Sequence, residues 1–310
     1  MKTIKVVSVN ISEQKGTIKK PVDMICINKM GVENDAHAGD WHRQISLLGK
    51  ESIEKFETVL GRKIEFGEFA ENITTEGITL YKTKPGDKLF IGDVELEITQ
   101  IGKKCHGDGC EIFSKVGQCV MPKEGIFAKV IKNGTVKAGD EIKYLPQVIK
   151  IQIVTLSDRA SKGEYQDKSG PKIYEMISDY YKSLDMVHFI DHQVIPDDAL
   201  MLKDILLNAR DEMYDVIITT GGTGIGPRDI TIETVQPLLD KEIPGIMEMI
   251  RMKYGQEKPN ALLSRGVAGV MGQTLIYTLP GSVKAVDEYM KEILKTLQHL
   301  IYMLHGIDIH

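Results

Sequence analysis

The stretch DVIITTGGTGIGPRDITIETV, residues 215–235, joins an apolar run typical of a buried strand to a segment with the spacing of a helix. Four glycines fall within six residues between them, and Pro227, Arg228 and Asp229 follow. Backbone N–H groups of such a turn, like those of a helix N-terminus, can bind phosphate oxygens. The stretch therefore predicts a strand and a helix of an alternating fold, with a candidate phosphate site between them.

The same alternation of strands and helices extends on both sides of this turn. The segments VIKIQIVTL, MVHFIDHQVI and TLIYTLP indicate strands, helical segments separate them, and a long closing helix is expected from Val283 onward. This order predicts a three-layer α/β domain with a mostly parallel sheet, whose ligands bind beyond the carboxyl ends of the strands. Pro146 marks the boundary, so we divide the chain into residues 1–146 and 147–310.

The first half of the chain has short strand-like segments and turns instead. DKLFIGDVELEITQI alternates on both sides of Gly92 and Asp93, which is the pattern of a hairpin. The segment GKESIEKFETVLG has apolar residues at helical spacing and ends at Gly61, a residue that commonly stops helices. We therefore predict a β-rich N-terminal domain, a barrel or a compact mixed sheet, with one clear helix.

Composition and charge limit the classes of function. The 310 residues are 42% hydrophobic and 27% charged, and no apolar run reaches the length of a membrane span. The start of the chain lacks the apolar core of a signal peptide, and four cysteines do not make a disulfide framework, so we expect a cytoplasmic protein. The net charge is +1 before Gln147 and −6 from there on, so we expect neither nucleic acid nor membrane as a partner.

Two common phosphate motifs do not fit the glycine-rich turn. Its glycines have the spacings of a Walker A loop and of a dinucleotide fingerprint, but Pro227 stands where the first needs Lys and the second needs Gly. A turn in which the glycines serve only backbone geometry remains an alternative. Asp197 and Asp229 follow two different predicted strands, and two carboxylates facing phosphates favour a Mg²⁺ ion between them.

Further segments of the second half accompany this turn in a recognisable order. They are SDRASKGEYQDKSGP, IPDD, TTGGTGIGPRDIT, EIPGI, LLSRGVAG and TLIYTLPGS. Together they closely resemble the MogA/MoaB family of molybdenum cofactor biosynthesis, over essentially all of residues 148–310. The resemblance implies a molybdopterin adenylyltransferase, which uses Mg²⁺ and ATP to adenylate the terminal phosphate of molybdopterin and releases pyrophosphate. One departure is Ile232, where many relatives have Pro.

The resemblance also implies roles for individual residues. Asp197 and Asp229 match the catalytic aspartates and are the expected Mg²⁺ ligands. The expected nucleotide and pterin site comprises Ser157, Asp158, Asp167, Gly221, Gly222, Thr223, Gly224, Pro280, Gly281 and Ser282. We interpret His188 and His192 as surface or structural residues, because histidines are often partly buried without a catalytic role.

Four segments of the first half resemble the MOSC domain, a module of molybdenum cofactor sulfurases and of small cofactor-binding enzymes. They are GVENDAHAGDWHRQISLL, GEFAENITTEGI, GDKLFIGDVELEITQIGKKCHGDGC and MPKEGIFAKVI. Relatives often have Gly where Asn34 and Ala70 stand. The match covers about residues 1–146 and implies a β-rich barrel that binds the molybdenum cofactor or carries sulfur.

Cys105 stands at the MOSC position that binds molybdenum or carries sulfur. Lys103, Lys104 and His106 beside it favour the thiolate form. The polar residues of the matching motifs that are expected in the same pocket are His37, Arg43 and Asn72. A zinc site that also uses His106, Cys110 and Cys119 is an alternative, although the spacing lacks a Cys-x-x-Cys pair.

The two resemblances predict a protein of molybdenum cofactor biosynthesis. The C-terminal domain would adenylate molybdopterin with MgATP, and the MOSC domain would bind cofactor or sulfur. Expected partners are molybdopterin, ATP, other biosynthesis proteins of this cofactor, and further copies of the chain in a homo-oligomer, a trimer by family resemblance. Two alternatives remain open, a carrier that binds molybdopterin species without catalysis and a molybdenum-dependent reductase that uses Cys105.

Overall fold

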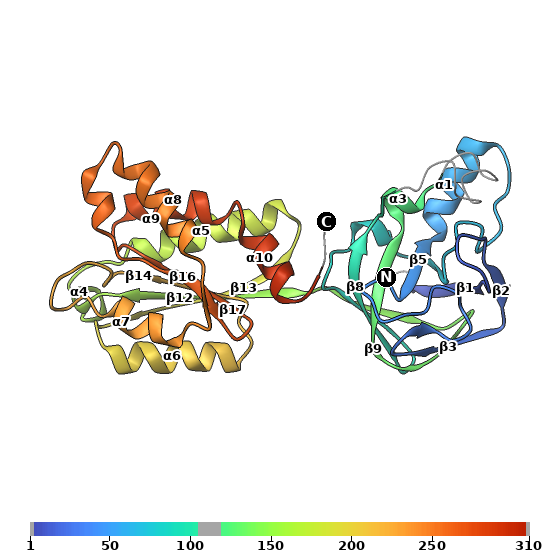
Figure 1. The fold of residues 1–310 in the computed structure, drawn as a ribbon, viewed down its shortest axis with the longest axis horizontal. Helices are drawn as coiled ribbons and strands as arrows, with labels where there is room; N and C mark the ends of the chain where they lie inside the picture. Colours follow the sequence, from blue (N-terminus) through green and yellow to red (C-terminus); the bar gives the residue numbers. More distant parts are fainter. Residues whose placement is uncertain (1–2, 105–118, 308–310) are drawn as a thin grey trace. The chain divides into compact units, whose positions relative to one another are not determined.

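The computed structural model describes residues 3–104 and 119–307 (Figure 1). The chain divides after Gln147 into two compact units, of which the main parts are Met1–Gln147 and Val148–His305. Each of the four hydrophobic clusters is drawn from a single unit. None of the helices in the described ranges has the length and apolar character to cross a membrane.

The first unit contains an eight-stranded sheet and a three-stranded sheet. The order of strands in the larger sheet is β11 (Ile142–Leu145), β7 (Lys88–Ile91), β8 (Val94–Ile101), β9 (Ile126–Lys132), β5 (Ile45–Gly49), β6 (Ile73–Glu76), β1 (Lys5–Ile11) and β2 (Lys20–Val22). The smaller sheet has the order β10 (Gly134–Lys137), β3 (Met24–Asn28) and β4 (Gly31–Val32). The β-rich character predicted for this half is therefore confirmed.

Two local predictions in this unit are confirmed as well. β7 and β8 pair antiparallel around a turn in which Ile91 is opposite Val94, and Gly92 has a φ of 57°. Helix α1 (Lys50–Leu60) ends at Gly61, which has a φ of 68° and donates its N–H to the carbonyl of Glu57. Both glycines occupy the left-handed region that most side chains disfavour.

Backbone hydrogen bonds also join the β11 region, at one end of the larger sheet, to the region of β1, the second strand from the other end. The N–H of Ile142 in β11 donates to Ile4 O at 2.8 Å, and the N–H of Val6 in β1 donates to Asp140 O at 2.9 Å. The sheet therefore curves until β11 approaches β1. Most of its buried apolar residues share one cluster, while Leu48 of β5 and Phe127 of β9 pack in a second cluster with α1. Short helices α3 (Met121–Glu124) and η1 (Leu80–Lys82) complete the described part of this unit.

The second unit has one six-stranded sheet that is mostly parallel. Its order is β13 (Val187–Ile195), β12 (Val148–Leu156), β14 (Val216–Thr220), β17 (Thr274–Leu279), β16 (Ala268–Met271) and β15 (Lys241–Glu242). The first four strands pair parallel to each other, and β16 and β15 continue the sheet antiparallel. The predicted strand VIKIQIVTL is β12 to the residue, because most of its residues are apolar, as is typical of a strand buried along most of its length.

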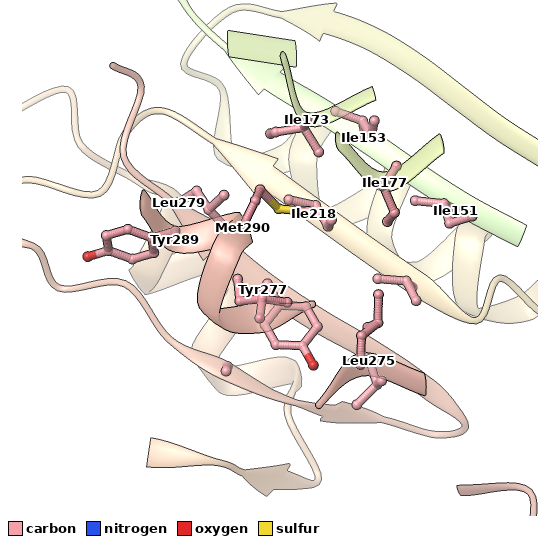
Figure 2. Packing of buried hydrophobic residues seen from close by; sticks show 14 of the residues in the cluster. Ile151, Ile153, Ile173, Ile177, Ile218, Leu275, Tyr277, Leu279, Tyr289 and Met290 are labelled. Atoms are coloured by element: carbon pink, nitrogen blue, oxygen red, sulfur yellow. The ribbon is translucent and has the colours of Figure 1, made fainter. Parts of the chain in front are cut away.

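Helices cover both faces of this sheet (Figure 1). On one face lie α5 (Ser169–Ser183), α8 (Pro244–Gly255), α9 (Val283–Ile293) and α10 (Leu297–Leu304), and on the other lie α6 (Ala199–Asp211) and α7 (Thr231–Val235). Alternate residues of a strand point to opposite faces of the sheet. Ile218 packs in the cluster with α5 and α9, and Ile217 packs in the cluster with α6. Figure 2 shows Ile173 and Ile177 of α5 close to the β12 side chains.

The closing helix expected from Val283 onward is not continuous. It is divided into α9 and α10 by residues 294–296. Thr296 is the residue before α10 and has a φ of −119°, and its hydroxyl donates to the carbonyl of Ile293 at 3.3 Å. Thr can hydrogen-bond nearby backbone in this way, which competes with helix continuation.

Candidate functional site

Four parallel strands of the second unit end together at one edge of the sheet. Leu156 is paired with Ile195, and Thr220 is paired with Leu279. The loops that follow them begin at Ser157, Pro196, Gly221 and Pro280. All of the residues that the sequence predicts for the nucleotide and pterin site lie in these loops, at the position where α/β sheets bind ligands.

The glycine-rich turn after β14 cannot accept side chains at its first two positions. Gly221 has a φ of 103°, and a Cβ there would lie 2.3 Å from Leu156 O. Gly222 has a φ of 61°, and a Cβ there would lie 2.5 Å from Thr231 Oγ1. The Thr231 hydroxyl donates to Gly221 O at 2.8 Å and ties the turn to α7. These glycines therefore meet a backbone requirement and also leave the turn open to a ligand.

Three aspartates and one arginine gather beside this turn. The N–H of Asp158 donates to Asp197 Oδ2, and the N–H of Asp197 donates to Asp158 Oδ1, both at 3.3 Å. The guanidinium of Arg228 forms an ion pair with Asp158 Oδ2. Asp229 Oδ2 accepts from the N–H of Gly226 at 2.7 Å. The loops after β12, β13 and β14 thus bring their carboxylates to one place.

The surroundings of Asp197 disfavour its charged form. Burial raises the pKa of Asp197, and the charges of Asp158 and Asp229 raise it further, while Arg228 and the N–H of Asp158 act in the opposite direction. Crowded carboxylates of this kind repel one another unless a cation neutralises them. A raised pKa at a cluster of charges is typical of functional sites.

The carboxylates of this cluster do not form a ready-made metal cage. Within the described ranges, no three Asp, Glu, His or Cys side chains come together in a way that could hold a metal ion. Mg²⁺, however, is usually bound by one or two carboxylates together with phosphate oxygens and waters. Asp197 and Asp229 fit this role, so the residues present suit a Mg²⁺ ion that arrives with a phosphorylated ligand.

The larger of two cavities at this edge has a volume of about 520 Å³. Among the predicted residues, its walls include Gly221, Gly222, Thr223, Gly224, Asp229, Pro280, Gly281 and Ser282. Residues that the sequence analysis did not identify line it as well, and they include Lys258, Asn260, Lys284, Glu288 and Tyr289. Lys284 follows the loop after β17 by two residues in the first turn of α9, which is the one signal that could have identified it.

The second cavity, of about 390 Å³, lies on the other side of the same loop and shares Gly281 and Ser282 with the first. Ser157 and Asp167 line it, together with Arg159, Tyr165 and Lys168. The Arg159 guanidinium lies 5.6 Å from the centre of the Tyr165 ring. One edge of the sheet therefore offers two adjoining spaces, which suits two ligands that must meet.

Asp167 is held in place by a dense set of donors. Its Oδ1 accepts from the N–H and hydroxyl of Ser169, and its Oδ2 accepts from Thr155 Oγ1 at 2.7 Å. Burial alone would raise the pKa of Asp167, but these hydrogen bonds outweigh it and lower the pKa. His192 Nε2 lies 3.2 Å from Asp167 Oδ2, while His188 pairs with Ser178. Both histidines thus have structural partners. His192 contacts Asp167, which lines the second cavity.

Arg265 fastens the glycine-rich turn from outside. Its backbone N–H donates to Thr223 O at 3.2 Å, and its Nε donates to Gly224 O at 2.8 Å. The same guanidinium forms two hydrogen bonds with Glu233 of α7. The sequence analysis did not identify Arg265, although it lies within the segment LLSRGVAG.

The first unit has a cavity of its own, of about 280 Å³. His37, Arg43 and Asn72, the polar residues predicted to share a pocket, all line it. The other residues that line it are Lys15, Gly16, Trp41, Ser46, Ala70, Lys103, Met121 and Phe127. The lining that the structure describes contains three Lys or Arg side chains and no carboxylate, which suits an anionic ligand.

Aromatic rings hold the arginine of this cavity. The Arg43 guanidinium lies 4.7 Å from the centre of the Trp41 ring and 5.6 Å from that of Phe127. Its Nε is buried and lacks a hydrogen-bond partner among the described residues. Ala70 has a φ of 63° and Asn34 a φ of 62°, so both positions at which relatives often have Gly adopt the left-handed conformation.

A buried ion pair lies behind His37. Lys19 Nζ is 2.6 Å from Asp35 Oδ2, and both side chains are almost fully buried. The N–H of His37 donates to Asp35 Oδ1 at 3.0 Å, and His37 Nδ1 is 3.4 Å from the same oxygen. Burial alone would raise the pKa of Asp35, but His37 and Lys19 hold it well below its usual range.

Cys105 and its neighbours His106 and Cys110 lie outside the described residues. The molybdenum or sulfur role predicted for Cys105, and the alternative zinc site, therefore remain predictions. Lys103, two residues before Cys105 in the sequence, lines the cavity. Cys119 is partly buried and packs against the hydrophobic cluster that contains Ile53 of α1. Cys26 is partly buried in β3.

The sequence matches two known families. Residues 152–299 match the family described as "Probable molybdopterin binding domain", and residues 34–143 match the MOSC domain. A molybdopterin adenylyltransferase of Pyrococcus furiosus is 38% identical over 164 residues, which are 51% of this chain and 93% of that protein. Molybdenum cofactor biosynthesis protein B of Staphylococcus carnosus is 40% identical over 163 residues, with 52% and 93% covered.

A solved structure matches over the same half of the chain. The molybdopterin biosynthesis enzyme MoaB of Thermus thermophilus is 39% identical, has a TM-score of 0.47, and is covered to 97% by 51% of this chain. The matched half is the one in which the glycine-rich turn, Asp229, Asp167 and the loop after β17 line adjoining cavities. The chain therefore belongs to the family of molybdopterin-binding proteins that includes molybdopterin adenylyltransferase and molybdenum cofactor biosynthesis protein B, and it carries a MOSC domain in its first unit.

Proposed function

We propose that the second unit is a molybdopterin adenylyltransferase that transfers AMP from MgATP to the terminal phosphate of molybdopterin. The observation that carries this proposal is the pair of adjoining cavities, which share Gly281 and Ser282 at the edge of the sheet. One space carries the glycine-rich turn and Asp229, and the other carries Ser157 and Asp167. Two phosphorylated ligands can meet at such a shared loop.

The proposed reaction needs little proton chemistry from the protein. An oxygen of the molybdopterin phosphate attacks the α-phosphorus of ATP and forms a new P–O–P bond. The bond from the α-phosphorus to the bridging oxygen breaks, and pyrophosphate leaves with that electron pair. The attacking oxygen is mostly ionised near neutral pH, so a strong general base is unnecessary. Catalysis then consists of positioning and of neutralising phosphate charge.

The residues divide this work between backbone and side chains. The N–H groups of Gly222, Thr223 and Gly224 are suited to bind phosphate oxygens, because the turn has no side chains in the way at its glycines. Asp197 and Asp229 would hold a Mg²⁺ ion bound to the phosphates of ATP, and that ion would lower their negative charge. Asp158 orients Asp197 through their paired hydrogen bonds.

Incubation of the purified chain with molybdopterin, ATP and Mg²⁺ tests the proposal. We expect adenylyl-molybdopterin and pyrophosphate in equal amounts, with neither product when Mg²⁺ is omitted. Binding of both ligands with no pyrophosphate release would favour the carrier that binds molybdopterin species without catalysis.

We propose that the first unit binds the molybdenum cofactor or its sulfur, with Cys105 as the ligand or sulfur carrier. The cationic cavity supports this proposal, since Arg43, Lys15 and Lys103 suit the phosphate of a pterin and Trp41 and Phe127 suit its ring. Loss of bound cofactor in Cys105→Ser, with adenylation unchanged, is the expected result. Stoichiometric molybdenum in the purified chain together with reductase activity would favour the molybdenum-dependent reductase.

We further infer that the first unit is a barrel, that the second is a three-layer α/β domain, and that residues 1–146 and 147–310 are independent domains. The hydrogen bonds between β1 and the β11 region support the first inference, and helices on both sheet faces support the second. Separate hydrophobic clusters support the third. A homotrimer follows from the family resemblance, and sedimentation of the full chain tests it.

A further inference from the structure

Arg228 lies beside the aspartates of the site, and the proposed reaction gives it no role so far. It lies in the loop after β14, and its side chain is 67% exposed. Its guanidinium reaches across to Asp158 in the loop after β12, the neighbouring strand of the sheet. The side chain therefore spans the edge at which the glycine-rich turn and the aspartates meet.

The Arg228–Asp158 pair is held weakly. The Arg228 side chain is exposed and that of Asp158 is 29% exposed. Ion pairs that water reaches typically contribute about 0–1 kcal/mol, because water screens them and ordering the side chains opposes them. A phosphate chain offers more, since a guanidinium can donate two parallel hydrogen bonds to phosphate oxygens. Arg228 can therefore leave Asp158 and bind phosphate when phosphate is present, because breaking the ion pair costs little free energy.

The charge of the site makes this exchange useful. Asp158 and Asp197 hydrogen-bond each other, Asp229 follows Arg228 directly in the chain, and the Arg228 guanidinium pairs with Asp158 beside these three carboxylates. Without a phosphorylated ligand, Arg228 therefore serves as the counter-ion of this cluster. A Mg²⁺ ion bound with ATP would supply that positive charge instead, and the guanidinium would be free to bind phosphate.

We propose that Arg228 is a two-position residue, which pairs with Asp158 in the nucleotide-free chain and moves to the β- and γ-phosphates of ATP in the complex. This proposal rests on the proposed adenylyl transfer and adds a catalytic residue to it. When the bond to the α-phosphorus breaks, negative charge grows on the oxygen that leaves with pyrophosphate. A guanidinium at the β-phosphate stabilises that charge and favours the leaving group.

Nucleotide affinities test the proposal without any measurement of turnover. Calorimetric titration with ATP and with AMP, each in the presence of Mg²⁺, compares the wild type with Arg228→Gln and Arg228→Lys. We expect Arg228→Gln to weaken ATP binding about 10-fold or more, or about 1.4 kcal/mol, and to change AMP binding less than about 2-fold. Arg228→Lys should be intermediate, because it keeps the charge but loses the planar fork.

Arg210→Gln is the matched control. Arg210 is also partly exposed and also pairs with a carboxylate, that of its neighbour Asp211 in α6. We expect both nucleotide affinities to remain unchanged in this variant. If Arg228→Gln weakens ATP and AMP equally, the residue merely supports the loop, and the proposal is wrong.

A second titration examines the nucleotide-free position. Mn²⁺ alone, detected by its free-ion paramagnetic resonance, should bind Arg228→Gln several-fold more tightly than the wild type, because the internal counter-ion is gone. Equal or weaker Mn²⁺ binding would exclude the counter-ion role. A wild-type chain that binds ATP but forms no adenylyl-molybdopterin would overturn the proposed function, while the ATP-to-AMP comparison would still decide the role of Arg228.

Discussion

Asp158 and Asp197 exchange hydrogen bonds, each carboxylate accepting from the backbone N–H of the other residue at 3.3 Å. The pair joins the loops after β12 and β13, so the two loops cannot move independently. It also places two negative charges side by side, and Arg228 neutralises only one of them. Such an arrangement sacrifices stability for a site that is ready to receive a cation.

Asp197→Asn should abolish adenylation and stabilise the fold. Because folding raises the pKa of Asp197, the folded chain holds this proton more tightly, so the carboxyl favours folding at low pH and the benefit is lost as pH rises through the folded pKa. At pH 7 the neutral amide removes the repulsion while it can still accept from Asp158. We expect a rise of about 2–4 °C in the unfolding midpoint of the second unit.

Scanning calorimetry at several pH values measures this effect. The gain over the wild type should shrink as the pH falls through the raised folded pKa of Asp197, because the wild-type carboxyl is then itself protonated. Asp229→Asn should match the loss of activity. A variant that is inactive but less stable than the wild type at pH 7 would mean that Asp197 is a structural residue.

Gly222→Ala should disrupt the glycine-rich turn. The new Cβ would lie 2.5 Å from Thr231 Oγ1 at a φ of 61°, where Ala is strained. We expect a loss of about 1–3 kcal/mol in the free energy of unfolding and a sharp fall in ATP affinity. Gly245→Ala in α8 is the control, because no atom lies within 4 Å of its Cβ and its φ is not positive. Normal ATP affinity in Gly222→Ala would contradict a ligand role for this turn.

Sequence patterns predicted the strands around the site better than the contacts within it. Strand β12 could be predicted because burial along most of its length favours a mostly apolar run. The strand order of the first unit could not, since β5 pairs parallel with β6 and antiparallel with β9, and short strands carry no signal for distant partners. In the second unit, the parallel strands determine that ligands bind at their carboxyl ends. Motifs that follow the predicted strands could therefore be assigned to that edge of the sheet.

The residues missed in the site share a physical reason. Arg265 binds a carbonyl of the glycine-rich turn and the carboxylate of Glu233. These contacts depend on the fold, and the residues next to Arg265 in the sequence do not indicate them. Lys258 lies between helices, where a charged residue ordinarily indicates only a solvated surface. The pairing of Asp158 with Asp197 depends on the conformations of two loops, and the hydrophobic periodicity of the sequence does not predict such contacts.

Asp35→Asn should strongly destabilise the first unit. It leaves Lys19 buried without its partner, a change that typically costs about 3–5 kcal/mol. The wild-type unit should in turn be sensitive to acid. Because folding lowers the pKa of Asp35, its stabilisation is full above the unfolded pKa, near about 4, and is lost as pH falls through the folded value.

Fluorescence of Trp41 makes this measurement specific. It is the one tryptophan of the chain and lies in the first unit, so urea unfolding followed at this residue reports on that unit. Glu95→Gln, which breaks a more exposed pair with Lys88, should change stability by less than about 1 kcal/mol. Equal effects of the two substitutions would show that the buried Lys19–Asp35 pair contributes no more to the free energy of unfolding than an exposed pair.

Residues 148–310, expressed alone, should fold and keep the adenylyltransferase activity. Both hydrophobic clusters that hold the six-stranded sheet are made of residues of this part, and so are the two cavities at its edge. A unit with its own core and its own site does not need the other for either. The measurement compares the fragment with the full chain in product formation and in the unfolding midpoint, with Asp229→Asn in the fragment as the inactive control. A fragment that unfolds at the same temperature but forms no adenylyl-molybdopterin would mean that the MOSC domain completes the site, and the division of labour proposed for the two units would then be wrong.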